Sequence, residues 1–512
     1  MFTLPKRMTH NGLFYLTMAR SIHTGGSYDE AIKVLYTLQS NAADLQTIIK
    51  HNVNDPEKFK ETEKYLLRSG ITLEQLDNLS VIHVTGTKGK GTTCAFTEAI
   101  IRQYGFSTGF FSSPHLVSVR ERIRLNGEPI SQSHFAHFFW NVYRRLEQKR
   151  EYESDMPTYF KFLTILSFHM FLEANVDVAI LEVGIGGELD STNVVRNPVC
   201  VGITSLGLEH TLLLGNTLEK IAYQKSGIFK PHAAAFTVPQ PEIVMRVLRK
   251  RAVERRCRSL QVVSVTQIRE WNDLFSLVEL NDVQQQNASL SISMALEWMK
   301  LRCDKSPLIV NDTKYVNDFR NNHKTDKIDL SQAVYLNKIA TALANCKWPG
   351  RTQILRTSIA DFFLDGAHTI ESIENCISWF KKVSQETSIK FLLFNISGNR
   401  NSLQLLKLLK SLDFDKAYFA PNCVGIPSVE DMNSSYAQDM IDEQKKICEK
   451  HCELWGENSM LKNNVTEVLL DIKKYASSTR NNKVEILVTG SLHMIGAVLT
   501  ILDPNLTMTS NF

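Results

Sequence analysis

Residues 81–93 read Val-Ile-His-Val-Thr-Gly-Thr-Lys-Gly-Lys-Gly-Thr-Thr, a short β-branched run that breaks into glycines around lysines. The pattern predicts a strand, a tight loop and the beginning of a helix. Gly86, Gly89 and Gly91 would let the backbone turn several N–H groups toward one anion, and Lys90 would add a positive charge. Such a loop indicates a site for the phosphates of a nucleoside triphosphate.

The spacing departs from the common phosphate loop G-x-x-x-x-G-K-[ST], because Gly91 stands between Lys90 and the hydroxyls of Thr92 and Thr93. Ordinary kinases and switch GTPases are therefore poorer models for this chain. A glycine-rich turn without a ligand is the alternative, but the apolar residues that follow at helical spacing favour the nucleotide. We expect the following loop residues to contact it: Gly86, Thr87, Lys88, Gly89, Lys90, Gly91 and Thr92.

Composition places the chain among ordinary globular proteins. Its 512 residues are 43% hydrophobic, enough for roughly two to four domains. The 58 basic and 54 acidic residues are too evenly balanced to favour nucleic acid as a partner. Nine scattered cysteines predict reduced thiols in an intracellular protein. The sequence contains no run of about 18 apolar residues, so it predicts no membrane span.

The N-terminal segment has its own composition. No carboxylate precedes Asp29, and the basic residues before it are Lys6, Arg7 and Arg20. Residues 1–27 are interpreted as a mitochondrial presequence, with a disordered tail as the alternative. Met8 and Met18 offer downstream starts that would shorten or remove the signal. We therefore expect both a cytoplasmic form and a mitochondrial form, the latter in the matrix or associated with the inner membrane.

Strand and helix patterns alternate along the rest of the chain. Residues 28–300 predict helices followed by a mostly parallel sheet covered by helices on both faces. The pattern weakens over residues 301–347, which we interpret as an insertion or linker. Residues 348–512 predict a second, smaller α/β domain. Because ligands bind at the carboxyl ends of parallel strands, we expect the functional residues to follow the predicted strands.

Three such residues follow predicted strands of the first domain. Ser113, before a proline, could present a hydroxyl to a metal or a phosphate, although a plain turn is the alternative. Glu182 is placed like a Mg²⁺ ligand or a water activator, with a structural salt bridge as its alternative. His210 could complete a metal site or serve in packing. Glu188 and Asp190 are second candidates for the metal.

The second domain carries further candidates. Arg351 has a planar guanidinium suited to phosphate oxygens, and Asp365 and His368 follow one predicted strand three residues apart. Two other clusters are interpreted structurally. The basic residues between Arg246 and Arg258 favour a solvated helix face, and Cys448, His451 and Cys452 favour a surface helix over a zinc site.

Together, the triphosphate loop, the candidate metal ligands and the second domain suit ATP-driven ligation. In such a reaction a carboxylate attacks the γ-phosphate to give an acyl phosphate, and an amine then displaces phosphate. Closure of one domain on the other would exclude the water that hydrolyses this intermediate.

The sequence closely resembles the folylpolyglutamate synthases of the Mur ligase superfamily. The resemblance covers nearly the whole chain from Tyr28. The matching motifs are Thr85-Gly-Thr-Lys-Gly-Lys-Gly-Thr92, Phe111-Ser-Ser-Pro-His-Leu116, Arg120-Glu-Arg-Ile-Arg124, Pro157-Thr-Tyr-Phe-Lys-Phe162, Glu182-Val-Gly-Ile-Gly-Gly187, Lys225-Ser-Gly-Ile-Phe-Lys230, Trp348-Pro-Gly-Arg-Thr-Gln353, Asp365-Gly-Ala-His368 and Thr489-Gly-Ser-Leu-His493.

The resemblance implies a P-loop-type ATPase domain, a smaller Rossmann-like C-terminal domain that receives glutamate, and a monomer. The substrates it implies are ATP, L-glutamate and a reduced folate that already bears glutamate, such as tetrahydrofolate or its polyglutamates. The product would be lengthened by one γ-linked glutamate. Mg²⁺ is the implied metal, with a second Mg²⁺ and a monovalent cation such as K⁺ as further candidates.

The resemblance also implies roles for single residues. Lys90 and its loop would cradle the phosphates, and Ser113, Glu182 and His210 would bind Mg²⁺. Lys225 matches a lysine that many relatives carbamylate to reach a second Mg²⁺. The nucleotide would be contacted by Asn287, Arg351 and Asp365, the incoming glutamate by His368 and Ser491, and the catalytic set would be Lys90, Lys225 and His368. Folate would lie in the interdomain cleft near the 112–124 loop.

The chain departs from the family pattern at a few positions. Where the family reads Gly-x-His-Gln-x-x-Asn-Ala, residues 281–288 place Val283 at the histidine and retain Gln284 and Asn287. Asn216 and Asn399 replace aspartates. Dihydrofolate synthase is the enzymatic alternative, and an inactive nucleotide-binding scaffold is the non-enzymatic one. The scaffold is disfavoured, because Lys90 and all three candidate metal ligands are retained.

Overall fold

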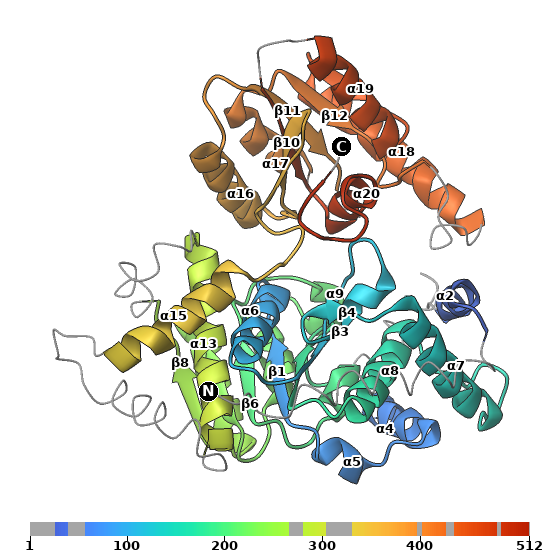
Figure 1. The fold of residues 1–512 in the computed structure, drawn as a ribbon, viewed down its shortest axis with the longest axis vertical. Helices are drawn as coiled ribbons and strands as arrows, with labels where there is room; N and C mark the ends of the chain where they lie inside the picture. The colour runs from blue at the N-terminus through green and yellow to red at the C-terminus, as the bar shows by residue number, and fades with distance from the viewer. Residues whose placement is uncertain are drawn as a thin grey trace, which may run out of the picture.

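The computed structural model describes residues 26–38, 57–265, 280–303, 330–396, 402–425, 435–478 and 483–510. Most of the predicted presequence, residues 304–329 of the predicted insertion and Asn399 lie outside these ranges. Two α/β parts are stacked, the larger N-terminal part at the bottom of Figure 1 and the C-terminal part at the top. The predicted α/β fold class, with two mostly parallel sheets, is confirmed.

The N-terminal sheet has the strand order β4-β3-β2-β5-β1-β6-β7-β8, and only the β2–β3 and β3–β4 pairs are antiparallel. The strand predicted at the start of residues 81–93 is confirmed as β1, which lies between β5 and β6. The edge strands β3, β4 and β8 are short and were not predicted. The bounds are β1 Val81–Thr85, β2 Thr108–Phe111, β3 Ile123–Leu125, β4 Glu128–Pro129, β5 Val178–Glu182, β6 Cys200–Ile203, β7 Ala234–Thr237 and β8 Ser259–Val262.

Helices cover both faces of this sheet. Ile82 and Val84 of β1 pack with α6, α13 and α15, whereas Val81 packs with α2, α4, α7 and α8. This alternation makes β1 an entirely buried strand. The bounds are α2 Tyr28–Thr37, α4 Glu57–Ser69, α5 Leu73–Asp77, α6 Lys90–Gln103, α7 Gln132–Gln148, α8 Tyr159–Glu173, α9 Thr211–Leu214, α10 Leu218–Lys225, α11 Glu242–Glu254, α13 Asp282–Cys303 and α15 Leu330–Ala344, with 3₁₀ turns at Val119–Arg122, Ser191–Val194 and Ser226–Ile228.

The C-terminal sheet has the order β13-β12-β11-β14-β10-β9, and β9 alone is antiparallel to its neighbour. Helices α16, α17 and α18 pack on one face and α19 and α20 on the other. The bounds are β9 Gln353–Arg356, β10 Ala360–Leu364, β11 Ile389–Phe394, β12 Lys416–Phe419, β13 Ser459–Leu461, β14 Val484–Thr489, α16 Ile370–Val383, α17 Ser402–Leu409, α18 Ser435–Trp455, α19 Val465–Ser478 and α20 Leu492–Leu502, with a 3₁₀ turn at Lys410–Leu412.

The loop after β2 joins the two parts. Leu116 packs against the hydrophobic core of the C-terminal part, and its carbonyl oxygen lies 2.1 Å from where a Cβ of Gly496 would stand. Only glycine fits α20 at this point. Trp348 packs edge-on against Phe110 at 5.6 Å, and the Arg124 guanidinium lies 5.1 Å from the Trp348 ring. The two sheets are thereby fixed with their carboxyl ends facing each other.

Helix α18 contains Cys448, His451 and Cys452 and is a surface helix, since Asp442, Lys446 and Lys450 are exposed. Cys448 and His451 are fully buried on its other face. The His451 ring packs between Phe394 and Phe419, at 5.3 and 5.7 Å, and neither ring nitrogen has a hydrogen-bond partner within the described part of the chain.

Among the described residues, no helix has the length and the apolar composition that a membrane span requires.

Burial of the His451 imidazole lowers its pKa from 6.5 to about 4. The unfolded chain therefore takes up this proton first as the pH falls, and folding stability is lost between pH 6.5 and 4. Between pH 7 and pH 4, we predict that the free energy of unfolding of His451→Leu falls by about 3 kcal/mol less than that of the wild type. Urea unfolding from pH 7 to pH 4 measures the effect, and identical pH slopes for the variant and the wild type would contradict it.

Candidate active site

A cavity of about 390 Å³ lies where the carboxyl ends of the two sheets face each other. Its lining comes from the loops after β1, β2, β5 and β6, from the start of α13, and from residues 348–352 and 365–376 of the C-terminal part. The predicted site residues that line it are Thr87, Lys88, Gly89, Lys90, Gly91, Thr92, Ser113, Glu182, His210, Asn287, Arg351, Asp365 and His368. Gly86, Lys225 and Ser491 are not among the lining residues.

The predicted phosphate loop runs from β1 into α6. Gly89 has φ +86° and precedes the helix, and a Cβ at this position would lie 2.3 Å from the Asn287 side-chain oxygen. The amides of Thr87 and Lys88 donate to the Ser205 carbonyl at 3.0 and 3.3 Å. The loop is thus attached to the end of β6. The first N–H groups of the 14-residue helix α6 have no acceptor within the helix, so this N-terminus suits an anion.

Gly91 explains the unusual spacing of the loop. A Cβ at this residue would lie 2.8 Å from a ring carbon of Trp348 and 3.2 Å from a carboxylate oxygen of Glu182. Trp348 belongs to the C-terminal part and Glu182 to the end of β5. The glycine therefore lets the second domain and an acidic strand end approach the N-terminus of α6.

Glu182, Ser113 and His210 lie in the same cavity. Glu182 is 4% exposed and accepts a 3.1 Å hydrogen bond from the Ser113 amide. Burial raises the pKa of this carboxyl, although Lys90 opposes the shift. Within the described ranges, no group of three or more His, Cys, Asp and Glu side chains could bind a metal by itself. The carboxylate and hydroxyl oxygens fit Mg²⁺ if phosphate oxygens complete its coordination.

The second candidates for the metal have structural roles. Glu188 forms ion pairs with Arg251 and Arg255. Asp190 caps a 3₁₀ helix, since its carboxylate accepts from the Thr192 amide at 3.0 Å and the Ile185 amide at 3.1 Å. Most of the basic cluster forms a solvated face, as predicted, but Arg251 is an exception at 5% exposed.

Lys225 lies behind the phosphate loop at the end of α10. Its side chain is 4% exposed, and Nζ donates to the Gly86 carbonyl at 2.5 Å. Burial, together with the nearby charge of Lys90, lowers the pKa of the Lys225 amine to about 7. Near neutral pH a large share of this amine is therefore uncharged and nucleophilic.

The C-terminal wall is arranged around Asp365. Its two carboxylate oxygens accept from the backbone amides of Thr352 and Ala367, at 2.9 and 3.0 Å. Burial raises the pKa of the Asp365 carboxyl, and Arg351 is the main opposing charge. Gln284 of α13 donates to the Thr352 hydroxyl at 2.7 Å, which adds a direct link between the two parts. Ser491 instead caps α20, because its hydroxyl accepts from the His493 amide at 3.1 Å.

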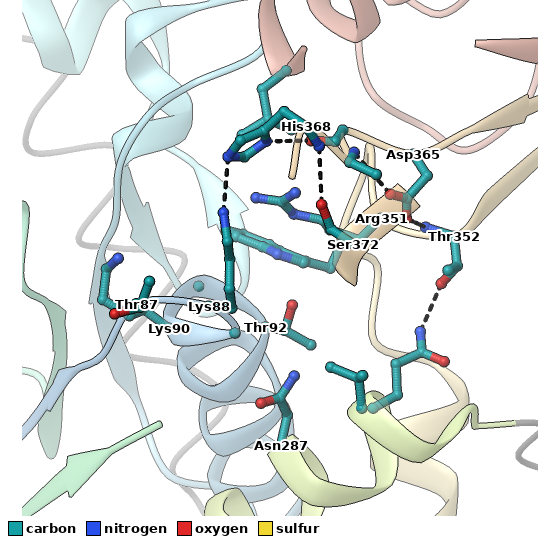
Figure 2. Close-up of a pocket in the computed structure, with 18 of the residues that line it drawn as sticks. Thr87, Lys88, Lys90, Thr92, Asn287, Arg351, Thr352, Asp365, His368 and Ser372 are labelled. Atoms are coloured by element: carbon teal, nitrogen blue, oxygen red, sulfur yellow. Dashed lines mark hydrogen bonds between the residues drawn. The ribbon is translucent and has the colours of Figure 1, made fainter. Parts of the chain in front are cut away.

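Lys88 takes a different direction from its loop. Figure 2 shows its side chain rising toward His368, where Nζ lies 2.9 Å from the imidazole Nε2. The Lys88 ammonium also lies 3.4 Å from a carboxylate oxygen of Glu209, a residue that the sequence analysis missed. The only sequence signal was an acidic residue beside His210 at the end of a strand. Burial opposes ionisation of Glu209, but the His368 imidazole, whose Nε2 lies 3.6 Å away, and the charge of Lys88 hold its pKa well below the usual range.

We predict that Gly91→Ala weakens binding of an ATP analogue about 10- to 100-fold, because the added methyl group forces Trp348 or Glu182 away. Calorimetric titration measures this affinity. Gly207→Ala is the matched control, since its Cβ would meet only a Thr87 methyl group at 3.9 Å. Equal affinities for the Gly91→Ala variant and the wild type would contradict the prediction.

Similar proteins are known over most of this chain. A family model described as "Dihydrofolate synthetase, C-terminal domain" matches residues 352–501. A mitochondrial folylpolyglutamate synthase of Cricetulus griseus is 36% identical and is aligned over 94% of this chain and 93% of its own length. The human protein of the same name is 41% identical over 84% of this chain and 73% of its own length.

Solved structures share the fold. The apo form of L. casei FPGS superposes with a TM-score of 0.66 at 22% identity, covering 93% of this chain and 99% of that one. E. coli FolC in complex with DHPP and ADP gives a TM-score of 0.61 at 23% identity, covering 91% and 98%. The relatives above 30% identity span most of this chain, and both of its sheets have counterparts in these structures. This chain belongs to the folylpolyglutamate synthase family of ligases.

Proposed function

We propose that this chain uses ATP to add L-glutamate, in γ-linkage, to tetrahydrofolate and its polyglutamates through an acyl phosphate. The observation that carries the proposal is that the phosphate loop and the Arg351, Asp365 and His368 side chains line one cavity between the two parts. A nucleotide bound at α6 would therefore present its terminal phosphate to the second domain. One of the structural relatives is a complex of FPGS with AMPPCP and folate.

The reaction follows from these groups. A folate γ-carboxylate oxygen attacks the γ-phosphorus of ATP, and the bond to the bridging oxygen of ADP breaks. The glutamate amine then attacks the acyl carbon, loses a proton and displaces phosphate. Lys90, the N–H groups of the loop and Arg351 stabilise the charge on the transferring phosphoryl group. Domain closure keeps water away from the acyl phosphate.

Ser113, Glu182 and His210 are the residues that we propose to bind Mg²⁺, with phosphate oxygens as further ligands. The ion would neutralise phosphate charge when bound. A carbamylated Lys225 is our candidate for a link to a second Mg²⁺, and K⁺ is a further candidate cation. Asn287 and Asp365 are proposed nucleotide contacts, and His368 and Ser491 are proposed to face the incoming glutamate.

The Lys225 proposal has a direct test. The neutral amine would attack CO₂ and release a proton, so a carbamate should form more readily as the pH rises above about 7. We predict a ¹³C carbonyl NMR signal in protein equilibrated with ¹³C-bicarbonate at pH 8, and its absence in Lys225→Met. Identical spectra for the two proteins would contradict carbamylation.

The phosphate-loop assignment is tested by Lys90→Ala. We predict that this variant loses the ADP formation that depends on both tetrahydrofolate and glutamate, because the loop lysine no longer neutralises the transferring phosphoryl group. The control is Lys250→Ala, whose side chain is 79% exposed on α11. Unchanged turnover in Lys90→Ala would contradict the assignment.

Dihydrofolate synthase is the second candidate function, favoured by the description of the family model that matches residues 352–501. It would join the first glutamate to dihydropteroate by the same chemistry. Supplying dihydropteroate in place of tetrahydrofolate separates the two activities. Turnover with tetrahydrofolate supports the first proposal, and turnover with dihydropteroate alone supports the second.

We further propose that the protein acts as a monomer with domains at 28–300 and 348–512, in both the cytoplasm and the mitochondrion. Relatives are named mitochondrial folylpolyglutamate synthases. The mitochondrial form, in the matrix or associated with the inner membrane, would depend on residues 1–27. Initiation at Met8 or Met18 would give the cytoplasmic form.

A further inference from the structure

Lys88 and Lys90 belong to one loop but serve different walls of the cavity. Lys90 is the first residue of α6, where the phosphates are expected. The Lys88 ammonium instead contacts His368 of the C-terminal part and Glu209 of the loop after β6. The Lys88 and Glu209 side chains remain 29% and 22% exposed, so the cavity gives access to both. The charge of Lys88 is therefore available to a ligand other than the nucleotide.

Glu209 differs from three other acidic residues of the cavity. Glu121, Glu182 and Asp365 each accept hydrogen bonds from backbone amides, which fix their carboxylates in place. The contacts of Glu209 in the described structure are with the side chains of Lys88 and His368. A carboxylate contacted by side chains can exchange them for a ligand without disturbing the backbone.

His368 cannot replace Lys88 as the group that binds a carboxylate. Its Nδ1 lies 2.8 Å from the Gly366 carbonyl, which can only accept, so Nδ1 carries the proton. With the proton on Nδ1, Nε2 can accept the hydrogen bond that Lys88 donates. Lys88 is thus the hydrogen-bond donor of this cluster, and Glu209 and His368 are the acceptors.

We propose that Lys88 and Glu209 receive the incoming amino acid, Lys88 binding its α-carboxylate and Glu209 its α-ammonium group. This inference rests on the proposed ligase function. The Lys88 Nζ and the Glu209 oxygen lie 3.4 Å apart. Two groups on the same α-carbon are similarly close, whereas the side-chain carboxylate of glutamate is two carbons further away. The pair therefore matches the α end of the amino acid.

The exchange preserves the charge balance of the cavity. Lys88 would exchange Glu209 for the α-carboxylate of the amino acid, and Glu209 would exchange Lys88 for the α-ammonium group. Neither charge is then left unpaired. Lys88 also stands two residues before Lys90. The amine of the amino acid would consequently lie next to the phosphate loop, beside the acyl phosphate that it attacks.

The test compares L-glutamate with two amides. L-isoglutamine lacks the charge of the α-carboxylate, and L-glutamine lacks that of the side chain. For each amino acid, kcat/KM is measured with saturating ATP and tetrahydrofolate. In Lys88→Met we expect the preference for glutamate over isoglutamine to fall about 10- to 100-fold, which corresponds to loss of one charge-assisted hydrogen bond. The preference for glutamate over glutamine should be unchanged.

Two variants accompany this measurement. Lys250→Met removes an exposed lysine from α11 and should keep both preferences. Lys88→Arg retains the charge and should retain most of the preference over isoglutamine. If Lys88→Met has no turnover, calorimetric binding of glutamate and isoglutamine to the enzyme loaded with an ATP analogue and tetrahydrofolate supplies the same ratio.

The outcomes separate this inference from the proposed function. An unchanged preference over isoglutamine in Lys88→Met, in an enzyme whose wild type is active, would overturn the inference alone and leave Lys88 as a link between the domains. A loss of the preference over glutamine instead would assign Lys88 to the side-chain carboxylate and overturn it equally. A wild type with no glutamate-dependent ADP formation would overturn the proposed function itself.

Discussion

The contact between Trp348 and Gly91 is the constraint on which the rest of the site depends. The indole ring of the second domain lies where other phosphate loops can carry a side chain, 2.8 Å from the position of a Cβ. A glycine at this point lets the two sheets approach with their carboxyl ends facing each other. The phosphate loop, the acidic end of β5 and the Arg351–His368 wall then form a single cavity.

Burial also shifts the pKa values of groups in the cavity and behind the phosphate loop. Burial raises the pKa of Glu182 and Asp365 and lowers that of Lys225 to about 7. Each of these side chains is stabilised by a nearby opposite charge or by a backbone group. A site of this kind is complete only when a polyanionic nucleotide joins it, which suits an enzyme that must exclude water from an acyl phosphate.

Much of this architecture could be predicted from the sequence, because strand ends and glycine loops are local signals. The phosphate loop, Glu182, His210 and the Arg351–His368 segment were all predicted at strand ends and line the same cavity. The contacts between distant segments could not be predicted. Lys88 contacts His368, 280 residues later in the chain, and no local pattern marks Glu209 as its partner.

The burial of single side chains also could not be predicted. Most of the basic cluster is exposed, as predicted, but Glu188 pairs with Arg251 and Arg255. Helix α18 lies at the surface, as predicted, but Phe394 and Phe419 enclose the His451 ring on its buried face. In both helices the burial of these side chains depends on residues far away in the sequence.

The enzyme transfers a phosphoryl group from ATP to the folate and then transfers the folate acyl group to glutamate. The most direct measurement uses tetrahydrofolate labelled with ¹⁸O in its terminal γ-carboxylate, together with ATP and L-glutamate. An acyl phosphate requires that one labelled oxygen appear in the inorganic phosphate at each turnover, which mass spectrometry detects. Phosphate without label, released as the folate is lengthened, would contradict the account.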